Sequence, residues 1–158
     1  MRDFVASRVA DGEQRIKAAL TLHVNGELIL YPYGYTATAL PGDMTADDRA
    51  VFVKMAQAMA GLNGYSYMQS SSLYLTDGDE IDWLYHTYGI FAFTIELYPP
   101  PVATHSASVY PPYSVVPAQT ARNRDMLFYV INEAACAYAT IGKAAQYCAG
   151  APEIIPTS

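Results

Sequence analysis

The strongest constraint in this sequence is a nearly uninterrupted apolar run, Ile90–Leu97 (IFAFTIEL), in which Glu96 carries the only charge. Successive side chains of a strand point to opposite faces of the sheet, so such a run is typical of a central strand covered on both faces. A carboxylate in such a strand costs free energy unless it is paired or protonated. Glu96 is therefore either a strand-end residue turned toward solvent or a general base at the end of a central strand, where α/β sheets place their sites.

Other apolar segments and two helices surround this run. Ile16–His23 (IKAALTLH) and Glu27–Tyr31 (ELILY) have the length and composition of strands, and the turn dipeptide Asn25-Gly26 separates them. Thr45 is a good N-cap for the clearest helix, and Ala118–Cys136 predicts a final one. Helices that alternate with apolar strands indicate an α/β layer structure. No linker divides the chain, so we expect a single domain over residues 1–158.

Three stretches predict little regular structure. Ser70–Tyr85 is polar and rich in turn-forming residues, and Tyr98–Pro117 is rich in proline. The residues after Cys136 follow the last predicted helix, and we expect a tail there.

The composition excludes two classes of partner. Fifteen acidic against nine basic residues give a net charge of −6, which argues against nucleic acid, because phosphate binding needs clustered Lys and Arg. Hydrophobic residues make up 52% and charged residues 15% of the chain, as in a folded domain. No run approaches the roughly 18 apolar residues that span a bilayer, so we expect no membrane partner. Met1–Val5 also lacks the apolar segment that follows the charge in a signal peptide.

Two other polar residues are candidates for a site with Glu96. His23 ends the apolar segment LTLH, where the alternatives are an ordinary hydrogen-bonded histidine and a metal ligand or base. Two strand-end residues of this type in one sheet favour a site more than either residue alone. Tyr74 precedes the acidic turn Asp77–Glu80 and could close over a substrate; the alternative is an ordinary loop residue in a chain with 14 tyrosines.

The two cysteines, Cys136 and Cys148, are 12 residues apart. No Cys-x-x-Cys pair is present, which disfavours a zinc site built from thiolates. Two interpretations remain, namely two buried free thiols or one short-loop disulfide in a secreted protein. The residues around the cysteines do not form a dense apolar run, and this favours the disulfide.

Three motifs follow one another along the chain. The first is Leu22-His23 with Glu27–Tyr35 (ELILYPYGY), the second is Leu73–Asp79 (LYLTDGD) with Ile81–Trp83 (IDW), and the third is Phe91–Leu97 (FAFTIEL). Together they resemble the zinc metallocarboxypeptidases of the carboxypeptidase A and carboxypeptidase T type. The resemblance covers only the C-terminal half of that family's catalytic domain, and it implies a partial mixed β-sheet with flanking helices.

The resemblance implies roles for individual residues. His23 matches the third zinc ligand of the family, and Glu96 matches the general base that takes a proton from the zinc-bound water. Tyr74 matches a loop tyrosine that closes over the last residue of the substrate.

The resemblance also implies a pocket for the last side chain of the substrate. Ile81 matches the floor of this pocket, and Leu30, Gly34 and Thr94 match its walls. An apolar floor favours apolar or aromatic C-terminal residues, whereas the nearby carboxylate of Asp79 would admit Lys or Arg.

Some features of the family have no counterpart here. Its first two zinc ligands form a His-x-x-Glu motif, but the residues three positions after the histidines of this chain are Gly26, Gly89 and Ser108. Asn25 also stands where the family has a tyrosine. The resemblance therefore implies a truncated or split carboxypeptidase whose Zn²⁺ site is incomplete in this chain.

The sequence thus predicts a secreted zinc metallocarboxypeptidase, a protease that releases C-terminal amino acids from peptides and proteins. The isolated chain is expected to be inactive, with the missing N-terminal half-domain as its partner. The alternative is a non-catalytic remnant that binds a peptide or a protein partner through Tyr74 and the Ile81 pocket. Export, which the resemblance implies, adds to the argument for a Cys136–Cys148 disulfide.

Overall fold

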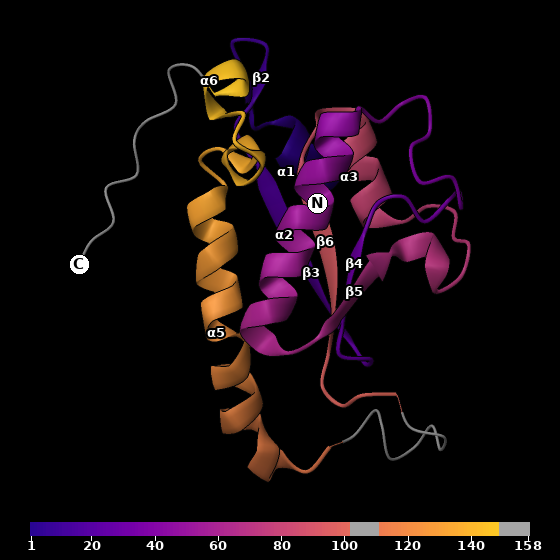
Figure 1. Cartoon of the computed structure of the whole chain (residues 1–158), viewed down its shortest axis with the longest axis vertical. Helices are drawn as coiled ribbons and strands as arrows, with labels where there is room; N and C mark the ends of the chain where they lie inside the picture. Colours follow the sequence, from indigo (N-terminus) through magenta and orange to yellow (C-terminus); the bar gives the residue numbers. More distant parts are fainter. Residues whose placement is uncertain (102–110, 149–158) are drawn as a thin grey trace, which may run out of the picture.

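The computed structural model describes residues 1–101 and 111–148. Its centre is a mixed sheet with the strand order β3-β6-β4-β5, formed by Ala18–Val24, Phe91–Leu97, Leu28–Tyr31 and Ser66–Gln69. β6 is parallel to β3 and antiparallel to β4, and β4 is parallel to β5. The apolar run therefore forms an inner strand, as its sequence predicts (Figure 1).

Two long helices, α2 (Ala46–Asn63) and α5 (Val116–Glu133), lie side by side on one face of this sheet (Figure 1). α2 begins where the sequence predicts, because Thr45 Oγ1 accepts a hydrogen bond of 3.0 Å from the Asp48 amide. Asp47 and Asp48 lie in its first turn, where carboxylates stabilise the positive end of the helix dipole.

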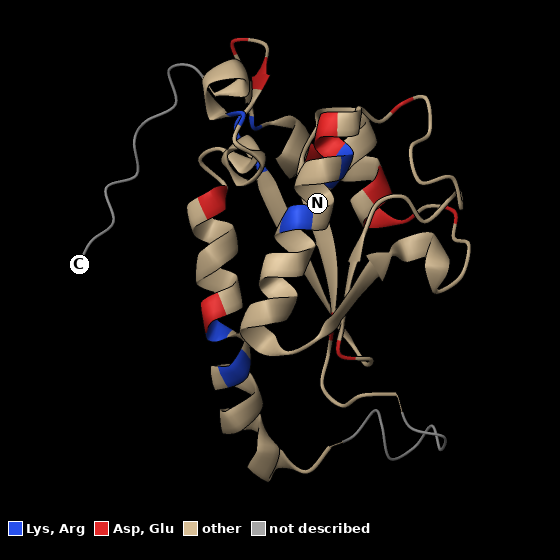
Figure 2. Ribbon diagram, in the orientation of Figure 1, with Lys and Arg blue, Asp and Glu red and all other residues tan. Residues whose placement is uncertain are grey.

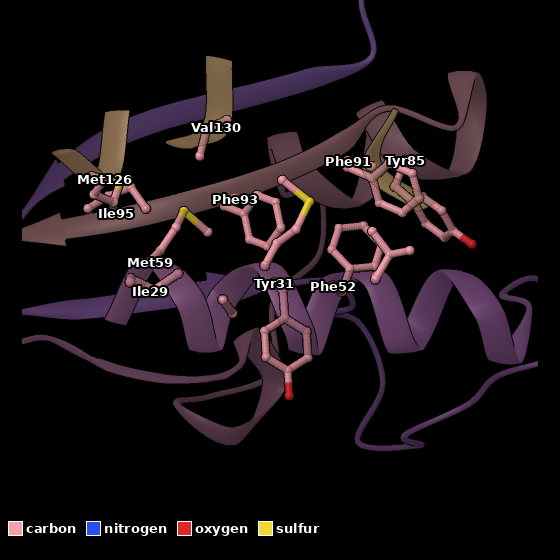
Figure 3. Close-up of a cluster of buried hydrophobic side chains, with 14 of the residues drawn as sticks. Ile29, Tyr31, Phe52, Met59, Tyr85, Phe91, Phe93, Ile95, Met126 and Val130 are labelled. Atoms are coloured by element: carbon pink, nitrogen blue, oxygen red, sulfur yellow. The ribbon is translucent and has the colours of Figure 1, made fainter. Parts of the chain in front are cut away.

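The main core lies between the sheet and these two helices. Phe52 of α2 is fully buried, and its ring centroid is 5.0, 5.1 and 5.4 Å from those of Tyr85, Phe91 and Phe93. Figure 3 shows these rings together with aliphatic and methionine side chains from the same layer. The fully buried methionines of this core are Met55, Met59 and Met126.

A second hydrophobic cluster lies on the opposite face of β6, against α1 (Arg2–Ala6) and α3 (Glu80–Tyr88). It consists of Val5, Ile81, Leu84, Ile90 and Ala92. Alternate residues of β6 enter alternate clusters, because the side chains of a strand point to opposite faces. This two-sided burial accounts for a strand sequence that is apolar at nearly every position.

The structure corrects the prediction for Ser70–Tyr85, which contains the start of a helix. A 3₁₀ turn, η1, occupies Ser70–Ser72, and α3 begins at Glu80. Asp79 caps α3, since its Oδ1 accepts a hydrogen bond of 3.2 Å from the Ile81 amide. Carboxylates favour both turns and helix N-termini, so the acidic residues that indicate a turn in the sequence form the helix start instead.

The residues after Cys136 are more ordered than the predicted tail. They form η3 (Ala137–Ile141) and α6 (Ala144–Tyr147). Lys143 Nζ and the Tyr147 hydroxyl each lie 2.7 Å from the Asp47 carboxylate, which ties the segment to the start of α2. Cys136 and Cys148 form a disulfide with a Cα–Cα distance of 5.9 Å, which confirms the predicted pairing.

Two of the predicted irregular stretches lie partly outside the described residues, at 102–110 in Tyr98–Pro117 and at 149–158 in the tail. At the end of the proline-rich stretch, η2 (Tyr113–Val115) leads into α5. Before the central sheet, β1 (Val9–Ala10) and β2 (Glu13–Gln14) pair as a short hairpin.

Charged residues surround the sheet rather than occupy it (Figure 2). Glu96 is the one Lys, Arg, Asp or Glu within the four strands of the central sheet. Among the described helices, none combines the length and the apolar character needed to cross a membrane.

Replacing Phe52 by alanine should lower the free energy of unfolding by about 3–5 kcal/mol, because it removes a fully buried ring and leaves a cavity among other rings. Urea unfolding followed by circular dichroism measures the change. Phe128→Ala is the matched control, since Phe128 is 52% exposed on α5 and should change stability by less than about 0.5 kcal/mol. Equal losses in the two variants would contradict a core centred on Phe52.

Candidate active site

The strand register brings His23 and Glu96 together. They are direct partners in the parallel pair of β3 and β6, near the carboxyl ends of both strands. His23 Nδ1 lies 3.9 Å from Glu96 Oε1. Side chains at the carboxyl ends of parallel strands are placed to meet a ligand outside the sheet, so the two residues form a candidate site.

Two of the predicted pocket residues lie on the same face of the sheet as this pair. Thr94 is two residues before Glu96 on β6, and it pairs with Leu30 of β4 and with Thr21 of β3. Leu30 and Thr94 are buried, with 4% and 6% of their surfaces exposed. Since side chains alternate with a period of two, the register places Glu96, Thr94, Leu30 and His23 on the face that α3 covers.

The two members of the central pair differ in exposure. The Glu96 side chain is 15% exposed, whereas that of His23 is 53% exposed. Burial raises the pKa of the Glu96 carboxyl above its ordinary value, and the nearby His23 offsets part of this increase. His23 Nε2 lies 3.2 Å from Thr21 Oγ1, within hydrogen-bond distance.

A buried carboxylate that the sequence did not single out fixes the segment at Gly34. Asp82 of α3 is 9% exposed. It accepts hydrogen bonds from the Gly34 amide at 2.9 Å and from the Tyr35 amide at 3.1 Å. Burial raises the pKa of Asp82, and these two amides counteract the increase. An acidic residue in the first turn of a helix is common, so the sequence gives no signal of this longer-range contact.

Gly34 lies against a group of polar side chains. A Cβ atom at this position would clash with Thr76 Oγ1 and lie 3.2 Å from both Asp79 Oδ2 and Ser70 Oγ. Only glycine therefore leaves room for these three side chains. Ser70 Oγ donates to Asp79 Oδ2 at 3.4 Å, while the buried Thr76 Oγ1 has no hydrogen-bond partner among the described residues.

The remaining predicted residues have other surroundings. Ile81 is 1% exposed and packs in the second hydrophobic cluster. The carboxylate of Asp79 already caps α3 through the Ile81 amide. Tyr74 is 64% exposed, and its hydroxyl makes no hydrogen bond to a described residue. The substrate-binding roles of all three residues stay predictions.

The described residues do not complete a metal site. Within residues 1–101 and 111–148, no group of three His, Cys, Asp or Glu side chains could hold a metal ion. A catalytic zinc site needs three protein ligands, and His23 is the one predicted ligand in this part of the chain. The residues present therefore do not fit a complete zinc centre by themselves.

A cavity of about 660 Å³ lies at the other end of the strands. Its lining includes Lys17, Phe91 and Tyr138, together with the disulfide. None of the predicted catalytic, metal-binding or substrate-binding residues borders it, so it is separate from the candidate site.

Comparison with known proteins decides the family. The family profile described as zinc carboxypeptidase matches residues 1–139. The chain belongs to the zinc carboxypeptidase family. Among its relatives, the zinc carboxypeptidase of Saccharothrix mutabilis subsp. capreolus is 37% identical over 140 residues, which are 89% of this chain and 32% of the relative. Carboxypeptidase A1 of Bos taurus is 38% identical over 84 residues, which are 51% of this chain and 20% of the relative.

Solved structures show the same carboxypeptidase fold. Thrombin activatable fibrinolysis inhibitor superposes with a TM-score of 0.68 at 19% identity, over 84% of this chain and 32% of that chain. The chain thus spans about a third of the length of these two proteins, each of which it matches over most of its own length. The predicted family and the predicted mixed sheet with flanking helices are both confirmed.

Glu96→Gln should raise the stability of the chain at neutral pH. Because the pKa of Glu96 is raised by folding, its ionised form destabilises the folded state above that pKa, and this cost disappears as the pH falls through it. Glutamine cannot ionise, so the gain should vanish below about pH 4, where the glutamate is protonated in both states. Urea unfolding from about pH 3 to pH 8 measures the difference.

Glu13→Gln is the control for this experiment, since the Glu13 side chain is 69% exposed. Its effect on stability should change little with pH. A Glu96→Gln variant whose stability relative to the wild type is independent of pH would contradict the burial of this carboxylate.

Proposed function

We propose that this chain forms part of the catalytic domain of a zinc-dependent carboxypeptidase, with Glu96 as its general base and His23 as one metal ligand. The observation that carries the proposal is the direct pairing of these two residues at the carboxyl ends of parallel strands. Membership of the zinc carboxypeptidase family, on the match over residues 1–139, supports the choice of reaction.

The surroundings of Glu96 suit a general base. Its carboxylate is mostly buried, and burial strengthens it as a proton acceptor by raising its pKa. In peptide hydrolysis such a carboxylate takes a proton from the attacking water and returns it to the leaving amine. The His23 side chain is 53% exposed, so it is accessible to a ligand.

We further propose that a second polypeptide segment supplies the missing zinc ligands and docks at β3. The chain spans 32% of the length of its Saccharothrix relative. In the described part of the chain, β3 pairs only with β6 and forms one edge of the sheet. Leu22 and Val24 of β3 are 54% and 56% exposed, and apolar side chains on an unpaired strand edge recruit another strand. Without that segment the chain would be inactive.

We propose a secreted protein whose substrates are the C-termini of peptides and proteins. The disulfide between Cys136 and Cys148 supports export, because structural disulfides persist in oxidising compartments. For the substrate, Leu30, which pairs with Thr94, and Ile81 are buried apolar side chains, and these favour apolar or aromatic last residues.

The reaction can be tested by co-expressing this chain with the N-terminal part of the catalytic domain of a related carboxypeptidase. The complex should bind zinc and release C-terminal amino acids, whereas the isolated chain should do neither. Glu96→Gln should lower the rate by about 10²–10⁴ and leave the zinc content unchanged, because Glu96 is a base and not a ligand. His23→Ala should lose both the metal and the activity.

His86→Ala is the matched control for the ligand, since His86 is another exposed histidine that faces a carboxylate, that of Asp43 at 3.1 Å. It should retain zinc and activity. If Glu96→Gln kept more than about a tenth of the rate, the loss would be too small for a general base. A complex that binds C-terminal peptides but never hydrolyses them would favour the non-catalytic remnant, which the incomplete set of ligands also supports.

The same complex tests specificity. Peptides that end in Phe or Leu should be cleaved faster than those that end in Lys or Arg, because Ile81 offers no charge partner. Asp79→Asn removes the competing carboxylate and keeps a good helix cap, so α3 should still start at the same place. Faster cleavage of basic residues, reversed by Asp79→Asn, would show that Asp79 and not Ile81 selects the substrate.

A further inference from the structure

A partly buried ion pair joins α5 to the turn between β3 and β4. Arg122 Nη1 lies 2.6 Å from Glu27 Oε1 and Nη2 lies 3.2 Å from Oε2, so the guanidinium holds both carboxylate oxygens. The side chains of Arg122 and Glu27 are 30% and 17% exposed. Such a bidentate contact fixes the orientation of the two side chains as well as their distance, which a single hydrogen bond does not.

The guanidinium of Arg122 is held on its other sides as well. Its Nε donates a hydrogen bond of 2.6 Å to the Asn63 carbonyl at the end of α2. Its Cζ lies 4.7 Å from the centroid of the Tyr65 ring. These contacts hold the Arg122 guanidinium of α5 against the end of α2. An exposed ion pair, by contrast, opens freely.

The turn that Arg122 holds lies directly against Glu96. The amides of Gly26 and Glu27 both donate to the Leu97 carbonyl, at 3.0 and 3.4 Å. A Cβ atom on Gly26 would lie 3.2 Å from the Cβ of Glu96. The turn therefore holds the backbone immediately after Glu96 and packs against the base of its side chain.

A second set of hydrogen bonds connects α5 to the peptide unit between Leu97 and Tyr98. The Tyr65 hydroxyl accepts hydrogen bonds from the Tyr98 amide at 3.2 Å and from Asn123 Nδ2 at 3.1 Å. The Leu97 carbonyl and the Tyr98 amide belong to one peptide unit, so this unit is held at both ends. Its orientation sets the direction in which β6 ends.

We propose that Arg122 is a positioning residue for Glu96, acting through Glu27 and the turn at Gly26. The inference rests on the proposed function only in that Glu96 is taken as the general base. A base must be held in place to act, because a misplacement of about 1 Å can cost about 100-fold in rate. β6 needs this support, since its ladder with β4 ends at Glu96.

The backbone of Glu27 points to the same role. Glu27 has a φ of +52°, in the left-handed region that favours glycine. A glutamate in this conformation costs free energy and persists where its surroundings hold it. The contact of its carboxylate with Arg122 offsets part of that cost.

Amide hydrogen exchange of the full chain tests the role without any need for activity. In Arg122→Gln, the Gly26 amide should exchange about 10-fold faster, as expected when the support of one hydrogen bond is lost. The amide of Phe93, in the middle of β6, should keep its rate. Arg122→Lys retains the charge but not the bidentate contact, so the exchange rate of the Gly26 amide should be intermediate. Glu27→Gln should add nothing to Arg122→Gln, because both remove one interaction.

Arg124→Gln is the matched control, since Arg124 lies on the same helix over the Phe128 ring, away from the turn. It should leave the Gly26 amide unchanged. An unchanged Gly26 rate in Arg122→Gln, or equal acceleration at Phe93, would overturn the proposal, because the first shows no support of the turn and the second a general loss of stability.

Kinetics of the co-expressed complex give the second readout. Arg122→Gln should lower kcat by up to about 100-fold, the cost of a misplacement of about 1 Å, with KM and zinc content unchanged, whereas Arg124→Gln should match the wild type. A loss confined to KM would overturn the positioning role. If the wild-type complex itself is inactive, the proposed function fails, and the exchange rates alone then decide whether Arg122 holds the strand end.

Discussion

The burial of β6 on both faces is the constraint on which the rest of this structure depends. The strand lies between a core of aromatic and methionine side chains under α2 and α5 and a smaller cluster under α1 and α3. Its side chains alternate between these layers, and this alternation fixes the face on which Glu96 emerges. Because β6 ends at Leu97, the carboxylate of Glu96 lies at the boundary between the hydrophobic core and solvent. A carboxylate at such a boundary is both desolvated and accessible, which is the combination that acid–base chemistry needs.

The two halves of the candidate site are built unequally. Glu96 is mostly buried and is packed by the turn at Gly26, while His23 lies on an edge strand with over half of its side chain exposed. This difference follows from the strand order, because β6 has a neighbour on each side and β3 has one in the described residues. The side of the site that includes Glu96 is therefore the more fully organised of the two in the described part of the chain.

The sequence predicts what depends on local pattern. The nearly uninterrupted apolar run Ile90–Leu97 indicated the central strand, and the cap at Thr45 located the start of α2. The start of α3 was missed because aspartate is common both in turns and at helix N-caps. The sequence around Asp79 indicated a turn, whereas its carboxylate caps a helix. Contacts such as Asp82 with the Gly34 amide and Arg122 with Glu27 join residues 48 and 95 positions apart. No periodicity in one sequence encodes such pairs, because neither residue of a pair identifies its partner until the fold brings them together.

Asp79 has two structural roles, and together they limit how this protein can be engineered. Its carboxylate starts α3 and at the same time borders the polar group around Gly34. A library that randomised the loop before α3 to change substrate preference would alter helix nucleation in most of its members. The side chains that cap a helix well are Ser, Thr, Asp and Asn. Few other residues at this position would therefore keep the start of α3. Diversity is better introduced at neighbouring positions such as Leu75 or Asp77, which are exposed and make no side-chain hydrogen bonds to other described residues.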